Sequence, residues 1–139
     1  MSDLVERAIR FAKEKHKGQV DDEGVDYFLA HCSQVARIVR EVCSDERVIA
    51  AAYLHDTLKD TDTTYDNLNV EFGYYVADLV FQVTHEGNKE TGYYFPNLNS
   101  RDAILIKFAD RLSNLSRMGS WSKERQEHYL RKSKFWRSE

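Results

Sequence analysis

Helix-ending residues are scarce in this chain, and that scarcity limits its fold more than any other feature. Only 6 glycines and 1 proline, Pro96, occur among the 139 residues. A fold of many short strands joined by tight turns would need more of both, so the composition favours long helices. Because domains usually hold about 100–200 residues, we predict a single all-α domain over residues 1–139.

Apolar residues recur at helical spacing through most of the chain. Helices are predicted from Ser2 to His16, from about Phe28 through Val42, from Asp45 to the His55-Asp56 pair, from Thr63 or Thr64 through Phe72, and from Tyr75 to Thr84. Ser100 caps the strongest amphipathic pattern, RDAILIKFADRLSNLSRM, and a last helix follows it. The stretch EGNKETGYYFPNLN is the one long irregular segment, and no segment has a convincing strand pattern. The expected architecture is an all-α helical bundle.

Charge and hydropathy exclude several classes of protein. The sequence is 42% hydrophobic and 31% charged with a formal net charge of −3, so it has no global basic field to attract nucleic acid. No apolar run approaches the ~18 residues of a membrane span, and the charged N-terminal stretch does not resemble a signal peptide. Cys32 and Cys43 lie in apolar helical patterns and are expected to be small core residues. We expect a cytoplasmic protein.

Four polar residues stand on otherwise apolar helices. His31 lies near the start of the second predicted helix, and His55 and Asp56 end the third. Asp110 lies inside IKFADRLSNL, and a carboxylate beside a buried face is costly unless it is paired or binds a metal. Two imidazoles and two carboxylates suit Mn²⁺, Fe²⁺ or Zn²⁺, and the carboxylates favour the harder ions. Each residue taken singly has a structural alternative, such as an ion pair of Asp110 with Lys107.

The order of these residues resembles the H…HD…D signature of the HD-domain metal-dependent phosphohydrolases. Over residues 5 to 118, the blocks AIRFAKEKHKGQ, HCSQVARIV, AAYLHDTLKDT, FGYYVADLVFQVT and ILIKFADRLSNL resemble the hydrolase domain of RelA/SpoT proteins. The stand-alone small alarmone hydrolases, which include the metazoan SpoT homologues, are similar to this chain in size. The resemblance implies an HD-type helical bundle that removes the 3′-pyrophosphate of (p)ppGpp with Mn²⁺ as cofactor.

Residue roles follow from the same resemblance. It implies that His31, His55, Asp56 and Asp110 are the metal ligands and that Asn114, in ADRLSN, contacts the substrate.

Three further residues are expected to contribute to substrate binding. Gln19 belongs to the first resembling block and is expected to line the pocket, while Lys107 and Arg111 are expected to offset phosphate charge. The expected partner is a small phosphorylated nucleotide, with neither nucleic acid nor membrane involved. The oligomeric state is open, and a homo-oligomer is one alternative.

The segment HDTLKD departs from the family motif HDxxED, because Lys59 replaces the glutamate. Asp60 is kept and is expected to orient or activate the attacking water. A lysine cannot take up a proton unless its pKa falls far below its usual ~10.4. Three alternatives follow: Asp60 suffices while Lys59 clamps a phosphate, the site binds a nucleotide as a sensor but hydrolyses it poorly, or Lys59 points to solvent. The first is our working hypothesis.

Two more departures concern the nucleotide pocket. The block GQVDDEG has Val20, Asp21 and Asp22 where the family commonly has basic residues. Tyr27, in DYFLAH, is displaced by one position relative to the family's tyrosine before the first metal histidine. These differences leave the substrate open: it could be another alarmone, an adenine analogue or a nicotinamide dinucleotide phosphate. A nucleotidase of the wider HD superfamily is therefore an alternative to an alarmone hydrolase.

Overall fold

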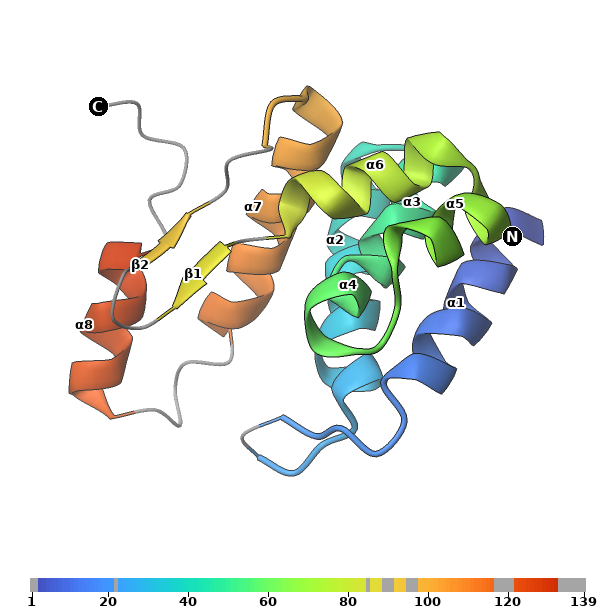
Figure 1. The fold of residues 1–139 in the computed structure, drawn as a ribbon. Coiled ribbons are helices and arrows are strands. Elements are labelled where there is room, and N and C mark those ends of the chain that lie inside the picture. The colour runs from blue at the N-terminus through green and yellow to red at the C-terminus, as the bar shows by residue number, and fades with distance from the viewer. Residues whose placement is uncertain are drawn as a thin grey trace.

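Helices make up most of the computed structural model (Figure 1), which describes residues 3–21, 23–84, 86–88, 92–94, 98–116 and 122–132. In chain order the helical elements are α1 (Asp3–Lys15), η1 (Phe28–Cys32), α2 (Ser33–Val42), α3 (Glu46–Leu54), α4 (Thr57–Asp60), α5 (Tyr65–Phe72), α6 (Tyr74–Val83), α7 (Arg101–Ser116) and α8 (Lys123–Lys132). The predicted all-α bundle is confirmed. Within the ranges given above, none of the helices combines the length and apolarity needed to cross a bilayer.

Side-chain caps begin three helices where the sequence predicts them. Asp45 accepts a hydrogen bond from the backbone N–H of Arg47 at 2.9 Å at the start of α3. Thr64 forms a reciprocal capping box at the start of α5. Ser100 Oγ accepts from the backbone N–H of Ala103 at 3.2 Å at the start of α7. Because caps satisfy backbone donors that a helix leaves unpaired, they define these starts locally.

The central helix of the bundle is α3. Every residue from 48 to 54 is buried, as expected for a helix that is apolar on most sides. It contacts α1, α2, α6 and α7, and Figure 1 shows it among these neighbours. Because α3 ends inside the bundle, His55 at its C-terminal end is only 4% exposed.

The second predicted helix begins with a π-helical turn, η1. The backbone N–H of Ser33 donates to the carbonyl oxygen of Phe28, five residues earlier. The residues that flank η1 have ordinary right-handed helical dihedrals, so it continues into α2 without a break. Apolar spacing did not predict this feature, because one widened turn hardly alters the pattern. π-turns are rare and occur often at functional sites, and His31 lies on this one.

A short hairpin differs from the sequence prediction, which expected no strand. β1 (Glu86–Asn88) pairs antiparallel with β2 (Gly92–Tyr94), with Glu86 opposite Tyr94 and Gly87 opposite Tyr93. It lies within the stretch predicted to be irregular. Glycine is depleted in strands, so strands of three residues that contain Gly87 and Gly92 have no recognisable pattern. The fold class is unaffected.

Candidate metal centre

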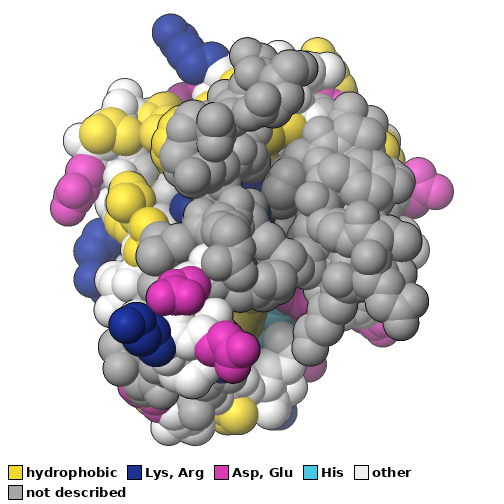
Figure 2. Space-filling view, turned by 90° about the vertical axis from the view of Figure 1, so that its left-hand side faces the viewer, with side chains coloured by type: hydrophobic (Ala, Val, Ile, Leu, Met, Phe, Trp, Pro, Cys, Tyr) yellow, Lys and Arg dark blue, Asp and Glu magenta, His cyan; other side chains and the backbone are white. Residues whose placement is uncertain are grey.

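The four polar residues predicted from the sequence meet inside the bundle. His31 comes from η1, His55 and Asp56 follow α3, and Asp110 lies in the middle of α7. His31, His55 and Asp110 are almost inaccessible, with exposures of 1%, 4% and 6%. Among the described residues on the face that Figure 2 presents, histidine is visible only as a small cyan area. Segments far apart in the chain therefore contribute to one buried site.

Nitrogen and oxygen atoms of these side chains converge on one small volume. The Nε2 atoms of His31 and His55 are 3.1 Å apart. Asp110 Oδ1 lies 2.8 Å from His31 Nε2 and 3.5 Å from His55 Nε2. Asp56 Oδ2 lies 3.1 Å from His55 Nε2 and 3.4 Å from His31 Nε2. We call these four residues the His–Asp cluster.

Hydrogen-bond partners of the two Nδ1 atoms orient both imidazoles so that their Nε2 atoms face the other cluster residues. His55 Nδ1 lies 2.7 Å from the carbonyl oxygen of Ala52, which can only accept, so Nδ1 carries the proton. Ser113 donates its hydroxyl proton to Gln34 Oε1 at 2.7 Å, so its oxygen accepts from His31 Nδ1 at 3.1 Å. Each neutral imidazole therefore presents the lone pair of Nε2 to the cluster, as a metal ligand must.

The His–Asp cluster favours positive charge at its centre. Burial lowers the pKa of both imidazoles, but the carboxylates of Asp56 and Asp110 outweigh it, raising the pKa of His31 and bringing that of His55 to about 10. Burial raises the pKa of both carboxyls, but the imidazoles, and at Asp110 the ammonium of Lys107, hold both pKa values well below their usual range. Protons or a metal cation can supply this charge.

The spacing within the cluster fits a divalent ion. Ligand atoms that lie about 2.1 Å from a common ion, at right angles to each other, are about 3 Å apart. The nitrogen–oxygen contacts in the cluster run from 2.8 to 3.5 Å. The ligand atoms of His31, His55 and Asp110 all lie within 4.8 Å of one another. Since a mixed nitrogen and oxygen set suits Mn²⁺, Fe²⁺ or Zn²⁺, these residues can hold a divalent metal.

Both carboxylates are held from outside the cluster. Lys107, which is 6% exposed, places its ammonium 2.7 Å from Asp110 Oδ2 and leaves Oδ1 facing the imidazoles. Tyr27 donates its hydroxyl proton to Asp56 Oδ2 at 2.6 Å. Burial, and then the charge of Asp56, raises the pKa of Tyr27 far above its usual range, so the phenol remains a donor.

Three more of the predicted site residues lie around α4, which begins directly after Asp56. Lys59 and Asp60 are both exposed on this single helical turn. Partial burial of its carboxyl, and then the charge of Asp56, raises the pKa of Asp60. Gln19 donates from Nε2 to the backbone carbonyl of Asp60 at 3.0 Å, and its Oε1 lies 2.9 Å from Nδ1 of the buried His16.

The last two predicted residues lie on α7 and are half-buried. Asn114 follows Asp110 by four positions, so the two share one face of the helix. Arg111 follows Asp110 directly, and adjacent positions on a helix do not face the same way. Asn114 therefore lies on the face of α7 that carries Asp110, and Arg111 lies beside that face.

The contacts made by Ser113 and Tyr27 were missed by sequence reasoning. Ser113 is fully buried and reaches His31 across 82 positions of the chain. A polar residue three positions after Asp110 on the same amphipathic helix was the available signal. Tyr27 was noticed only for its displaced position, and nothing in the sequence indicated that it reaches Asp56.

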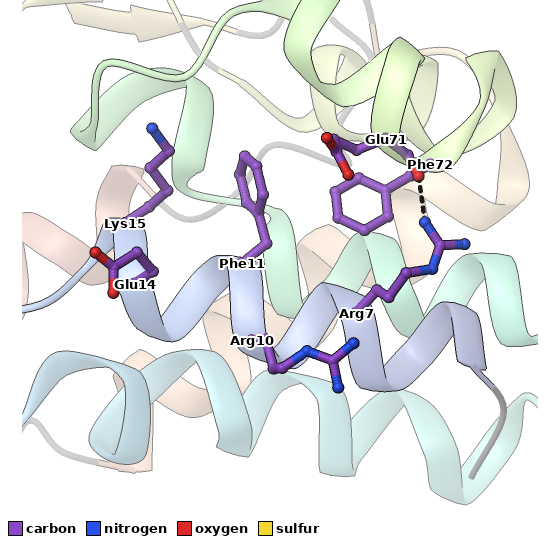
Figure 3. A pocket seen from close by; sticks show the side chains of 7 residues that line it. All are labelled: Arg7, Arg10, Phe11, Glu14, Lys15, Glu71 and Phe72. Carbon is purple, nitrogen blue, oxygen red and sulfur yellow. Dashed lines mark hydrogen bonds between the residues drawn. The ribbon is translucent and has the colours of Figure 1, made fainter.

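A hollow between α1 and α5 is lined by none of the predicted site residues (Figure 3). Its wall consists of Arg7, Arg10, Phe11, Glu14, Lys15, Glu71 and Phe72. The rings of Phe11 and Phe72 meet edge to face, with centroids 5.4 Å apart. Arg7 donates to the backbone carbonyl of Glu71, and Lys15 pairs with Asp62 at 2.9 Å. Since two of its cations already have partners, we do not take this hollow as the site.

Comparison with protein families agrees with the geometry. The family model described as HD domain matches residues 8–91, a stretch that contains His31, His55 and Asp56. This chain belongs to the HD-domain family. The fourth cluster residue of this HD domain, Asp110, lies beyond the matched stretch, and the structure brings it to the other three.

Curated relatives assign this HD domain to the SpoT-type branch. The guanosine-3′,5′-bis(diphosphate) 3′-pyrophosphohydrolase MESH1 of Danio rerio is 38% identical over 138 residues, with 88% of this chain and 76% of the relative covered. The protein of that name from Xenopus tropicalis is 35% identical, with 98% and 82% covered. A guanosine-3′,5′-bis(diphosphate) 3′-pyrophosphohydrolase of Aquifex aeolicus is 38% identical, but the match spans only 18% of that longer protein.

A solved structure supports the same branch. It is described as a metazoan ortholog of SpoT that hydrolyzes ppGpp, and it matches this HD domain with a TM-score of 0.83 and 29% sequence identity. The match covers 96% of this chain and 83% of that one. The predicted resemblance to RelA/SpoT-type hydrolases is therefore confirmed.

Proposed function

We propose that this HD domain is a metal-dependent phosphohydrolase that removes the 3′-pyrophosphate of (p)ppGpp or of a related phosphorylated nucleotide. The observation that carries the proposal is the His–Asp cluster, whose two Nε2 lone pairs and two carboxylates face one another. Relatives named for this reaction, which match most of this chain and of their own length, give further support.

The ion we propose is Mn²⁺, held by His31, His55, Asp56 and Asp110. Two carboxylates in the donor set favour a harder ion than Zn²⁺. When bound, such an ion lowers the pKa of water and polarises a phosphoryl oxygen. The protein's own part is to keep the ligand atoms oriented. Ser113 holds one imidazole in the tautomer that a metal requires.

Asp60 and Lys59 are the residues we propose for the water and the substrate. A carboxylate whose pKa is raised is a better proton acceptor near neutral pH, which suits Asp60 as general base. We propose that Gln19 lines the substrate pocket here, because its side chain anchors the backbone of Asp60. The ammonium of Lys59 is exposed on the same turn, where it can offset the charge of a phosphate.

We propose that residues of α7 bind the rest of the nucleotide. Asn114 shares a face with Asp110 and is the proposed hydrogen-bonding residue, while Arg111 offsets phosphate charge. Lys107 was assigned to the substrate from the sequence. Its ammonium is buried in the ion pair with Asp110, so we propose that it acts through that carboxylate.

Two rival functions rest on specific features of the chain. If Lys59 disables the activation of water, the domain binds ppGpp as a sensor without turnover. The loop before η1 is closed by a bridge between Val20 and Asp26 and has acidic residues in place of basic ones. If that loop selects another nucleotide, the domain is a nucleotidase with a different substrate.

We propose that residues 1–139 act as a single domain in the cytoplasm, on a free nucleotide. The formal net charge of −3 supports a small-molecule substrate over nucleic acid, since it provides no attractive field for a polyanion.

Pyrophosphate release from ppGpp with added Mn²⁺ tests the proposal. We expect turnover by the wild type, and loss of both turnover and bound Mn²⁺ in Asp56→Ala. Asp66→Ala is the matched control, because Asp66 is an exposed aspartate in the first turn of α5. Bound Mn²⁺ at wild-type levels in Asp56→Ala would refute the ligand assignment.

A parallel measurement on Lys59→Glu separates the rivals. Turnover by this variant alone, with ppGpp binding by both proteins, would identify the wild type as a sensor. Turnover of dNMPs, NTPs or NADPH in place of ppGpp would identify a nucleotidase.

A further inference from the structure

Tyr27 contacts the His–Asp cluster and has no role in the function proposed above. Its hydroxyl donates to Asp56 Oδ2, the oxygen that also lies 3.1 Å from His55 Nε2 and 3.4 Å from His31 Nε2. Asp56 precedes α4, but its carboxylate does not cap that helix. Among the residues that the structure describes, the phenol is the one group outside the cluster that hydrogen-bonds this carboxylate.

The ring of Tyr27 is braced by its surroundings. Its centroid lies 5.3 Å from that of His16 and 5.4 Å from that of His31. The backbone N–H of Tyr27 donates to the carbonyl of Gln19 at 2.9 Å, and η1 begins at the next residue. Because the ring is already ordered by these contacts, its hydrogen bond to Asp56 costs little additional side-chain entropy.

Each of the other three cluster residues also has a hydrogen-bond partner outside the cluster. These pairs are Ser113 with His31, Ala52 with His55, and Lys107 with Asp110. Tyr27 occupies the corresponding place for Asp56. It differs from Lys107 in two ways: it is neutral, and it bonds the same oxygen that faces the imidazoles. The phenol therefore directs this oxygen without neutralising the carboxylate.

We propose that Tyr27 is a positioning residue of the metal centre, whose hydroxyl orients the Asp56 carboxylate so that Oδ2 faces the ion. The inference rests on the proposed function, because it takes Asp56 as a metal ligand. Partners that hydrogen-bond a metal ligand from behind typically change metal affinity by about 10–100-fold. Tyr27 contributes through Asp56 and is not itself a ligand.

Tyr27→Phe tests this inference, because it removes the hydroxyl and keeps the ring in contact with His16 and His31. We expect the Kd for Mn²⁺, titrated into ion-free protein, to rise about 10–100-fold. Excess Mn²⁺ is expected to restore pyrophosphate release. The matched control is Tyr75→Phe, because Tyr75 also donates to a carboxylate, that of Asp102, outside the cluster. Its Kd for Mn²⁺ should equal that of the wild type.

Three outcomes distinguish the possibilities. An unchanged Kd in Tyr27→Phe, beside clear binding of Mn²⁺ by the wild type, would overturn the inference and leave the proposed function standing. A wild type that binds no Mn²⁺ would overturn the proposed function itself. In an Asp56→Asn background, Tyr27→Phe should weaken Mn²⁺ binding no further, because its effect passes through that carboxylate. A full additional loss there would also refute the inference.

Discussion

Ser113→Ala tests whether the orientation of His31 depends on a hydroxyl behind it. The substitution removes the oxygen that accepts from His31 Nδ1 at 3.1 Å and the proton that Ser113 donates to Gln34 Oε1 at 2.7 Å. The side chain of His31 is 2% exposed, so water cannot readily replace that oxygen. Without it, the imidazole can move its proton to Nε2, where the proton competes with a metal ion.

Two free-energy losses are expected, and they are measured separately. Leaving a buried donor unsatisfied lowers the unfolding free energy of ion-free protein by about 1–3 kcal/mol. Loss of the partner behind a metal ligand weakens Mn²⁺ binding about 10–100-fold, which corresponds to about 1.4–2.8 kcal/mol. In saturating Mn²⁺ the two losses add, so the deficit against the wild type should be larger there than in chelator.

Urea unfolding with chelator and with saturating Mn²⁺, together with a Mn²⁺ titration, measures both terms. Ser44→Ala is the matched control, since Ser44 is an exposed serine between α2 and α3, away from the His–Asp cluster. It should leave Mn²⁺ affinity unchanged. If Ser113→Ala binds Mn²⁺ as tightly as the wild type, the argument that Ser113 sets the tautomer of His31 is refuted.

Two further predictions concern the charges of the cluster. The raised pKa values of the imidazoles stabilise ion-free protein fully below pH 6.5, and this contribution is lost as pH rises toward the pKa of about 10 of His55. The lowered pKa values of Asp56 and Asp110 stabilise it above pH 3.8, so their contribution does not change between pH 6.5 and 10. The free energy of unfolding measured in urea should therefore fall over this range, and Mn²⁺ should offset the fall. A flat profile would contradict this prediction. Lys107→Met leaves Asp110 without its buried cation and should cost about 3–5 kcal/mol in chelator, whereas Lys17→Met, at an exposed position, should be neutral in the same urea titration.

Local features of the fold were predictable from the sequence because their causes are local. Asp45 and Ser100 begin their helices through bonds to backbone groups two or three residues away. The burial of α3 follows from its composition alone. The fold class and the four cluster residues were also predicted, the latter through their order along helices that resemble a known family.

Other features depend on contacts between distant segments and could not be read from a pattern. Ser113 meets His31 across 82 positions, and Tyr27 meets Asp56 across 29. Lys107 was assigned to a substrate phosphate, because a basic residue near a phosphohydrolase site suggests that role. Its ammonium is buried against Asp110, three positions along the same helix, which is the ion pair that the sequence left open as an alternative. Sequence indicated which chemical groups were present, but not which of them face each other.

The π-turn of η1 holds one residue more than an ordinary α-helical turn, as if a single residue had been inserted into the helix. An added residue at this point widens the first turn and leaves α2, which follows it, in its original register. Leu29, which is 63% exposed, is a site where an extra residue disturbs little packing. A relative without that residue would keep an ordinary α-helical turn and carry its tyrosine one position nearer to its histidine. An ungapped alignment would then pair Tyr27 with the wrong residue, although both tyrosines could occupy the same place in space.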